Sequence, residues 1–167
     1  FASDAMAASA AGLTTEALLS NEGCPQVKLA DFGIAGAIDG ADASQRIRIS
    51  RATAGVAPER FGIGPVPAVR KVLAQAGLTL DQIDLVELNE AFAAQVLGCL
   101  GAWESDEYCK QHFGLDRAFG RLDRGKLNVD GGAVALGHPV GASGARIVLH
   151  MLKLLKRKNA KRGMASI

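Results

Sequence analysis

Residues 127–158 read LNVDGGAVALGHPVGASGARIVLHMLKLLKRK, and this stretch holds the patterns that decide the fold. We predict a strand over 127–136, a loop over 137–144 and an amphipathic helix over 145–158. A further strand over 163–167 follows the helix, so the segment is a strand-helix-strand unit. The apolar stripe of the helix is expected to consist of Ala145, Val148, Leu149, Leu152 and Leu155.

The same alternation of strands and helices extends toward the N-terminus. Residues 46–50 alternate polar and apolar side chains, which is typical of a half-buried strand, and residues 84–88 form a short apolar strand. Between them, Pro65 and Pro67 stand where a helix tolerates proline, and Gly77 ends that helix. Strands that alternate with helices predict an α/β layered domain, in which ligand chemistry follows the ends of strands.

Two other regions have weaker patterns. Residues 1–12 and 14–20 are predicted to be short helices, and residues 27–38 a strand. Residues 103–126 are polar and charged, and we interpret them as an inserted surface segment.

Composition excludes several classes of protein. The 167 residues are 49% hydrophobic and 22% charged, with a net charge of +2, so the chain has ample apolar residues for a core. No apolar run reaches the roughly 18 residues of a membrane helix. The near-neutral charge does not suggest nucleic-acid binding. Six basic residues within 153–162 are interpreted as a solvated helix face.

The cysteines and the chain ends carry further expectations. Cys24, Cys99 and Cys109 are too few and too irregularly spaced for a disulfide framework or a zinc site. We therefore expect no metal and a reducing, cytoplasmic location, with the mitochondrial or peroxisomal matrix as the eukaryotic alternatives. Both ends of the chain resemble cut ends, so we expect it to be part of a longer protein.

The loop that carries His138 is the first candidate for chemistry. His138 lies between two glycines and directly before Pro139, which restricts the backbone beside the imidazole. A histidine held there can act as a general base or donate a hydrogen bond to an oxyanion. A turn with a structural histidine is the alternative. The glycine spacing matches neither a P-loop nor the dinucleotide fingerprint.

The second candidate is the sequence Asn89-Glu90-Ala91-Phe92 at the end of the apolar strand. Buried amide and carboxylate groups at such a position are costly unless they have partners. Asn89 can position a water molecule or donate to an oxyanion, and simple helix capping is the alternative. Among the remaining polar candidates, His112 and His150 are expected to be surface or structural residues, and Cys99 to be buried and inert.

Three motifs occur in order: residues 89–92, residues 128–133 (NVDGGA) and residues 137–146 (GHPVGASGAR). Together they resemble the C-terminal domain of thiolases, and the acetyl-CoA acetyltransferases most of all. The resemblance covers residues 44–167, and it leaves residues 1–43 as a poorly matched remnant of the family's middle region. It implies a thiolase-like layered α-β-α-β-α fold, represented mostly by its C-terminal half and truncated before the last strands.

The resemblance also implies a mechanism and a site for the full-length parent. Thiolases condense acyl-CoA molecules, or cleave a 3-ketoacyl-CoA with CoA, through a cysteine thioester. His138 matches the histidine that activates the cysteine and borders an oxyanion hole. Asn89 matches the asparagine that holds the oxyanion-hole water. Ala91, Phe92 and Gly137 are implied to bind substrate, the first two by lining the acyl pocket.

Coenzyme A is a substrate in this reaction, so no cofactor is expected. The expected partners are acyl-CoA and CoA, with no nucleic acid or membrane, in a homodimer or homotetramer. Nothing in the sequence matches the family's nucleophilic cysteine motif, and the second catalytic cysteine would follow Ile167. These 167 residues alone are therefore expected to be inactive. The alternatives are a non-catalytic CoA-binding or scaffold protein, a β-ketoacyl synthase and a nucleotide-binding module.

Overall fold

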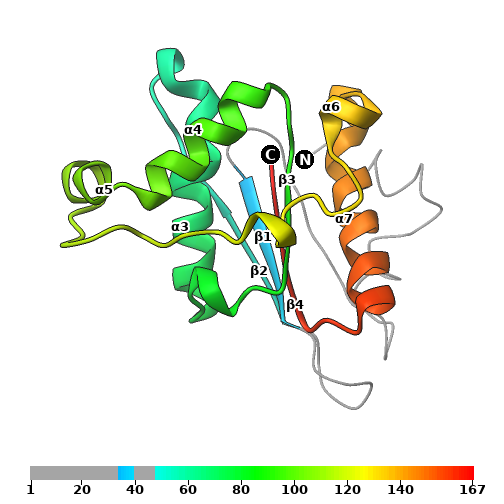
Figure 1. Cartoon of the computed structure of the whole chain (residues 1–167). Helices are drawn as coiled ribbons and strands as arrows, with labels where there is room; N and C mark the ends of the chain where they lie inside the picture. Colours follow the sequence, from blue (N-terminus) through cyan, green and yellow to red (C-terminus); the bar gives the residue numbers. More distant parts are fainter. Residues whose placement is uncertain (1–33, 40–47) are drawn as a thin grey trace.

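Four strands form one mixed sheet in the computed structural model, which describes residues 34–39 and 48–167 (Figure 1). The order across the sheet is β2-β1-β4-β3. β1 pairs antiparallel with both β2 and β4, whereas β3 and β4 run parallel. The strands are β1 (Ile34–Asp39), β2 (Arg48–Thr53), β3 (Leu85–Leu88) and β4 (Arg162–Ser166).

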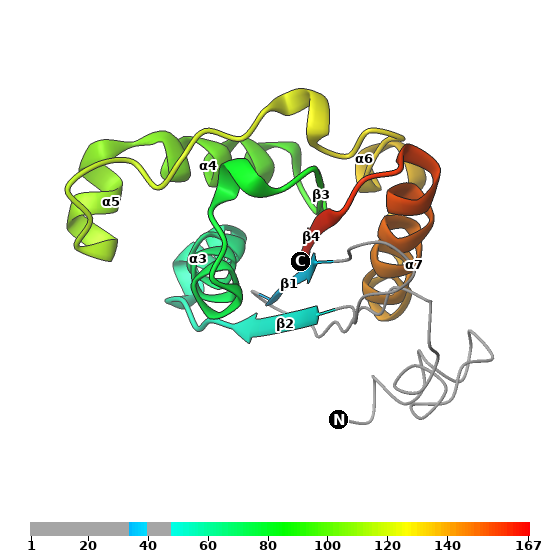
Figure 2. The same cartoon turned by 90° about the horizontal axis from the view of Figure 1, so that it is seen from below.

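Helices cover both faces of this sheet, and Figure 2 shows α3 and α7 on opposite sides of it. One side carries α3 (Pro65–Ala76), α4 (Ala93–Glu104) and α5 (Asp106–Phe113), and the other carries α6 (Ala133–Leu136) and α7 (Val140–Lys158). Three short 3-10 turns are η1 (Pro58–Ile63), η2 (Leu80–Gln82) and η3 (Arg124–Lys126). The predicted α/β layered class is therefore confirmed. No helix within the described residues is long and apolar enough to cross a membrane.

Several predicted elements are found at their expected places. Strands at 84–88 and 163–167 are confirmed by β3 and β4, and the strand expected at 46–50 lies at β2. Helix α3 begins at Pro65 and ends before Gly77, whose φ of 68° is left-handed and suits glycine. The helices predicted at 1–12 and 14–20, most of the strand predicted at 27–38, and Cys24 lie outside the described residues.

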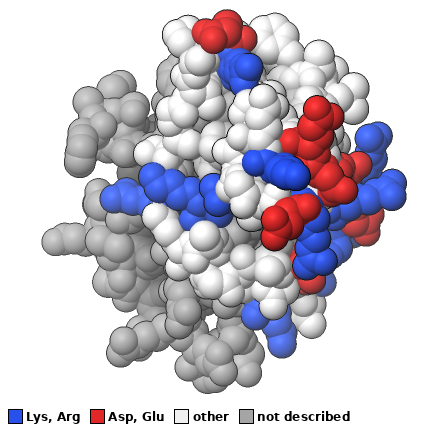
Figure 3. Space-filling model, turned by 90° about the vertical axis from the view of Figure 1, so that its left-hand side faces the viewer, with Lys and Arg blue, Asp and Glu red and all other residues white. Residues whose placement is uncertain are grey.

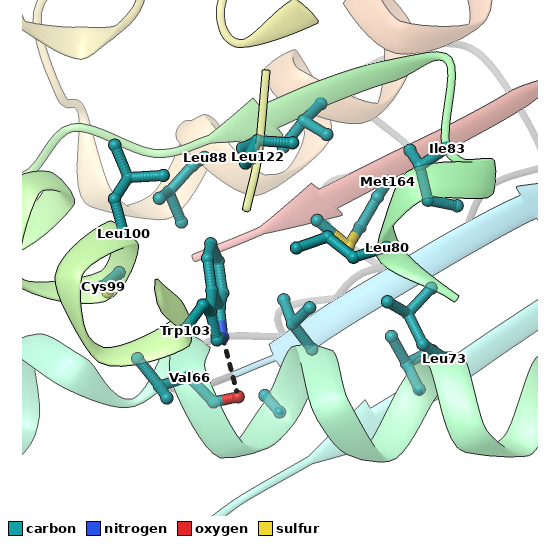
Figure 4. Packing of buried hydrophobic residues seen from close by; sticks show 14 of the residues in the cluster. Val66, Leu73, Leu80, Ile83, Leu88, Cys99, Leu100, Trp103, Leu122 and Met164 are labelled. Carbon is teal, nitrogen blue, oxygen red and sulfur yellow. Dashed lines mark hydrogen bonds between the residues drawn. The ribbon is translucent and has the colours of Figure 1, made fainter. Parts of the chain in front are cut away.

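The interpretation of residues 103–126 as a surface segment holds for most of its residues but is wrong for three of them. Trp103 and Cys109 are fully buried, and Leu122 is buried as well. Trp103 belongs to α4, and Figure 4 shows its ring directed toward α3, where its Nε1–H donates a hydrogen bond to the carbonyl of Val66 at 3.3 Å. The charged residues of this segment are exposed, except for Lys126, which is half-buried. Figure 3 shows acidic and basic side chains interspersed on the side of the molecule that carries α5. Their abundance concealed the few buried residues that anchor the segment.

The strand predicted over 127–136 is absent from this part of the described structure. Only Leu127 forms an isolated bridge, to Val86, and α6 begins at Ala133. Asn128 and Gly131 adopt positive φ values of 45° and 91°. Two left-handed residues so close together turn the chain and prevent a continuous strand.

Helix α7 begins at Val140, five residues before the predicted start, and its buried stripe differs from the prediction. The buried residues are Ser143, Ile147, Met151, Leu154 and Leu155. Of the predicted stripe, only Leu155 is buried, and Leu149 is 44% exposed. The sequence has two adjacent apolar stripes with the same helical spacing, so periodicity alone could not decide which one faces the sheet. Gly163 of β4 decides it, because its missing side chain leaves room for Met151.

Successive side chains of β3 point alternately to the two sides of the sheet. Val86 and Leu88 join the apolar cluster that contains α3 and α4, whereas Leu85 packs with α7. Side chains two residues apart share a face of a strand, and Glu87 accordingly meets His150 of α7. Asn89 follows at the carboxyl end of β3, where α/β folds place ligand sites.

Candidate active site

Asn89 is fixed by its backbone and buried by its neighbours. Its N–H donates to the carbonyl of Ser166 at 2.9 Å, which ties it to the end of β4, and the residue is only 3% exposed. Helix α4 begins four residues later, at Ala93, so Asn89 does not cap it. Among the described residues, the Oδ1 atom of Asn89 is the buried side-chain oxygen that accepts no hydrogen bond. A buried acceptor without a donor is costly, which is a common feature of functional sites.

His138 lies in the short connection between α6 and α7. Gly137 ends α6 with a φ of 87°, and Pro139 is the residue before the first turn of α7. The Nδ1 atom of His138 is 2.7 Å from the hydroxyl oxygen of Ser143, which is completely buried. The Ser143 hydroxyl donates to the carbonyl of Pro139 at 3.2 Å. With the serine proton directed there, the ring proton belongs on Nδ1, and Nε2 is left as an acceptor.

The fold brings Asn89 and His138 together from positions 49 residues apart. The Asn89 Nδ2 atom lies 3.5 Å from both ring nitrogens of His138. Contacts of this length are weak and directed at neither nitrogen. The two side chains are therefore adjacent, but neither uses up the hydrogen-bonding capacity of the other. Each can still bind a third group.

Asn128 binds the residues on both sides of Asn89, namely the backbone of Leu88 and the side chain of Glu90. Its Oδ1 accepts from the N–H of Leu88 at 2.9 Å, and its Nδ2 donates to the Leu88 carbonyl and to Glu90 Oε1, each at 2.8 Å. Glu90 Oε2 also accepts from the N–H of Val134 at 3.0 Å. The carboxylate that the sequence placed at a buried strand end is thus fully partnered. The sequence singled out Asn128 only as part of a motif, because its partners lie about 40 residues away.

A network of charged residues begins at Glu87, two residues before Asn89 on the same strand. Glu87 Oε1 is 2.8 Å from Nδ1 of His150, and Nε2 of His150 is 2.9 Å from Asp130, which also pairs with Arg157. Burial raises the pKa of Glu87, although nearby His150 opposes the shift. Hydrogen bonds from Arg157 and then His150 lower the pKa of Asp130. His150, expected to be merely a surface or structural residue, is the centre of this network.

A small pocket of about 70 Å³ is lined by Asn89 and by the Glu87–His150 pair, whereas His138 and Gly137 do not line it. Arg146 helps to form its wall, and the guanidinium donates to the carbonyl of Gly137 at 2.7 Å. Ala91 and Phe92 are exposed at the start of α4 and do not line this pocket. The lining residues are Glu87, Leu88, Asn89, Gly131, Gly132, Ala133, Leu136, Arg146, Ile147 and His150.

The two cysteines that the structure describes are remote from this chemistry. Cys99 is buried, and burial raises its pKa to about 12, so its thiol stays protonated and unreactive. Cys109 is buried too, donates to the carbonyl of Ala102 and accepts from the N–H of Phe119. Within residues 34–39 and 48–167, no cluster of three or more His, Cys, Asp or Glu residues is suited to a metal ion.

Comparison with known proteins adds the decisive observation. The family model described as "Thiolase, C-terminal domain" matches residues 44–167. The chain belongs to the thiolase family. This thiolase chain is 47% identical over 119 residues to an acetyl-CoA acetyltransferase of Chromobacterium violaceum, in a match that covers 70% of the chain. It is 43% identical over 149 residues to a beta-ketoadipyl-CoA thiolase of Pseudomonas aeruginosa, in a match that covers 88% of the chain.

Solved structures confirm the thiolase-like fold. The crystal structure of the acetyl-CoA acetyltransferase of Bacillus anthracis superposes with a TM-score of 0.54 at 41% identity, covering 68% of this chain and 25% of that one. The thiolase chain spans about a quarter of the Chromobacterium enzyme's length and 32% of the Pseudomonas enzyme's. The family is thus the one that the three motifs indicated.

Proposed function

We propose that this chain supplies the proton-transfer and anion-stabilising residues of an acetyl-CoA C-acyltransferase. Such an enzyme condenses acyl-CoA molecules or cleaves a 3-ketoacyl-CoA with CoA. The observation that carries the proposal is the meeting of His138 and Asn89 at the carboxyl end of β3. Several relatives at 43–47% identity are named acetyl-CoA acetyltransferase, which supports the same reaction class.

His138 has the geometry of a general base. Ser143 and the Pro139 carbonyl leave Nε2 as the acceptor nitrogen of the ring, with only the long 3.5 Å contact from Asn89 Nδ2. This nitrogen can take the proton of a substrate or enzyme thiol. Once protonated, the same Nε2–H can donate to the oxygen of a substrate that becomes negatively charged. One residue thereby serves thiol activation first and anion stabilisation second.

Asn89 completes the anion site. Its Oδ1 is a buried acceptor without a protein donor, so it can hold a water molecule that in turn donates to the oxyanion. Its Nδ2 already lies beside the imidazole. We assign Gly137, Ala91 and Phe92 to substrate contact. Phe92 is 61% exposed at the start of α4, so its side chain is accessible to a bound acyl group.

The nucleophilic thiol of this reaction has to come from outside the described residues. Cys99 and Cys109 are buried in the core and line no part of the pocket. Both are free thiols, which suits the reducing, cytoplasm-like compartment that we propose. We further propose that CoA and acyl-CoA are the only small molecules required, and that the enzyme is a homodimer or homotetramer.

A chimera tests this function. Residues 44–167 would replace the matching segment of the Chromobacterium violaceum acetyl-CoA acetyltransferase, and thiolysis of acetoacetyl-CoA by CoA would be measured. We expect turnover in the chimera. His138→Ala should abolish most of it, and Asn89→Ala should lower it by about 10²–10³, the usual cost of one oxyanion donor. His112→Ala is the matched control, because His112 is an exposed histidine on α5, and its ring contacts Tyr108 and not the candidate site.

The measurement also addresses the scaffold alternative, which gains support from the lack of a reactive cysteine among the described residues. We expect the isolated 167-residue chain to show no thiolysis. A folded chimera that binds CoA but has no turnover would favour a binding or scaffold role. Near-normal turnover in His138→Ala would refute the roles assigned here.

A further inference from the structure

His150 of α7 lies between two carboxylates that come from different segments. On one side, Glu87 of β3 is 3% exposed, and its Oε1 lies 2.8 Å from Nδ1 of the ring. On the other side, Asp130 lies 2.9 Å from Nε2. The imidazole itself is half-buried. Each ring nitrogen therefore faces a carboxylate oxygen at normal hydrogen-bond length.

Counting hydrogen bonds gives the number of protons shared by Glu87, His150 and Asp130, which we call the Glu87–His150–Asp130 row. A neutral imidazole has one N–H and can donate on one side only. The second short contact requires another proton, either on the ring or on a carboxyl group. The row Glu87–His150–Asp130 therefore holds two protons. Two guanidinium groups balance the acidic charge, because Arg157 pairs with Asp130 and Arg146 lies close enough to act on Glu87.

The row joins the three segments that build the candidate site. β3 leads directly from Glu87 to Asn89. The segment that carries Asp130 also carries Asn128, whose amide bonds to Leu88 and to Glu90. Helix α7 begins just after His138 and contains His150 three turns later. One imidazole therefore links the strand that leads to Asn89, the loop that binds the two residues beside Asn89, and the helix that follows His138.

We propose that His150 is a positioning residue. Through two shared protons it holds α7 and the Asn128–Gly131 loop against β3, and we call this set of contacts the clasp. The clasp thereby sets the separation of Asn89 and His138. The catalytic consequence rests on the function proposed above. The clasp itself does not, because it is a property of three segments of this chain.

Nuclear magnetic resonance of the 167-residue chain, with ¹⁵N in its histidine rings, tests the clasp without an activity assay. We expect two exchange-protected bridging protons at His150, one toward each carboxylate. Asp130→Ala removes the acceptor that faces Nε2, so it should abolish the bridging proton on Nε2 and keep the one on Nδ1. A residue that only fills space would have neither signal. A folded chain with one bridging proton, or with none, would overturn the proposal.

His150→Gln tests the positioning role, and His112→Gln is the matched control. The backbone N–H of Asn128 donates to the carbonyl of Val86, and the backbone N–H of Gly131 donates to the carbonyl of Asn128. Loss of a charge-assisted bond should open this loop, so both amides should exchange about tenfold to a hundredfold faster. The ring signals of His138 should shift as well. Exchange in α3, on the opposite side of the sheet, should stay unchanged.

His112→Gln should alter neither the loop amides nor the His138 ring. If His150→Gln leaves both unchanged while the chain is folded, His150 does not position the site. Because these readouts need no turnover, failure of the clasp and failure of the acyltransferase proposal can be told apart. An inactive chimera with an intact clasp would refute the reaction and leave the positioning role standing.

Discussion

The two sides of the sheet differ in what holds them together. On the side of α3 and α4, the buried side chains are almost entirely apolar, with Trp103 at the centre (Figure 4). On the side of α6 and α7, a smaller apolar cluster of Leu85, Met151, Leu154 and Leu155 lies beside buried or half-buried polar groups. The strand β3 supplies both sides in alternation.

This difference indicates a division of labour within one small domain. Burial of apolar area is the main stabilising term in folding, so the α3–α4 side should contribute most of the stability. Buried polar groups are stable only when fully partnered, and on the α7 side all but the Oδ1 atom of Asn89 are partnered among the described residues. The α7 side should therefore determine geometry more than stability.

Trp103→Ala should have the largest effect on stability. Removing a fully buried tryptophan typically lowers the free energy of unfolding by about 3–5 kcal/mol, and the hydrogen bond from Trp103 Nε1–H to the Val66 carbonyl would also be lost. Urea unfolding followed by circular dichroism measures the loss. Leu97→Ala is the control, because Leu97 is 56% exposed on the same helix. A loss for Trp103→Ala no larger than that of the control would contradict the assignment of stability to this side.

Gly132→Ala should have a smaller effect on stability but a direct effect on the site. A methyl group at this position would overlap the Glu90 carboxylate, which holds Asn128 and Val134. We expect a loss of about 1–3 kcal/mol, as for overpacking in a core, together with shifted signals of the His138 ring.

Gly101→Ala is the matched control for that substitution. Gly101 lies on the exposed side of α4, with open space around its missing side chain. Alanine is the better helix former there, so the control should stabilise the chain by about 0.5–1 kcal/mol. Equal effects of the two alanines would show that the Glu90–Asn128 contacts do not constrain the loop.

The smallest expected effect is a pH dependence confined to the α7 side. Burial raises the pKa of Glu87 above its ordinary value of 4.5, so the folded chain binds this proton more tightly than the unfolded chain. Stability should therefore fall as the pH rises from 4.5 through the raised pKa. Glu87→Gln should flatten this decline. Asp130 affects stability only at lower pH. Its pKa is lowered from 3.8, so its contribution to stability is lost as the pH drops below 3.8.

Urea unfolding across buffers from about pH 4 to about pH 8 measures the slope. Glu104→Gln, at an exposed ion pair with Arg121 on the other side of the sheet, should leave the slope unchanged. If Glu87→Gln leaves the pH dependence of the free energy of unfolding unchanged, the pKa of Glu87 does not differ between the folded and unfolded chain, and this prediction is wrong.

Much of the fold could be predicted from local patterns. Residues 84–88 read as a strand because the run is apolar and short, and Pro65 and Gly77 delimit α3 by their backbone preferences alone. The errors occurred where tertiary contacts override local pattern. Burial of Trp103 and Leu122 depends on α3 and β3, which are distant in sequence, and the buried stripe of α7 depends on the space above Gly163.

The candidate site was predicted in its residue types and only partly in its arrangement. Asn89 and His138 were recognisable because each stands in a short motif with a clear chemical use. The partners that orient them were not recognised, because Ser143 reads as an ordinary helix residue and the Glu87–His150 contact spans 63 residues. The substrate roles of Ala91, Phe92 and Gly137 remain predictions.

The sequence by itself determined the α/β class, the boundaries of α3 and the thiolase resemblance, and it singled out Asn89 and His138 as candidates for proton transfer and anion binding. These follow from backbone preferences, apolar spacing and motif chemistry, which act over a few neighbouring residues. Only the tertiary structure decided which side of the sheet is apolar, that Asn89 meets His138, and that His150 joins the three segments around them. Such contacts depend on the packing of β3, β4 and α7, and no local pattern contains that information.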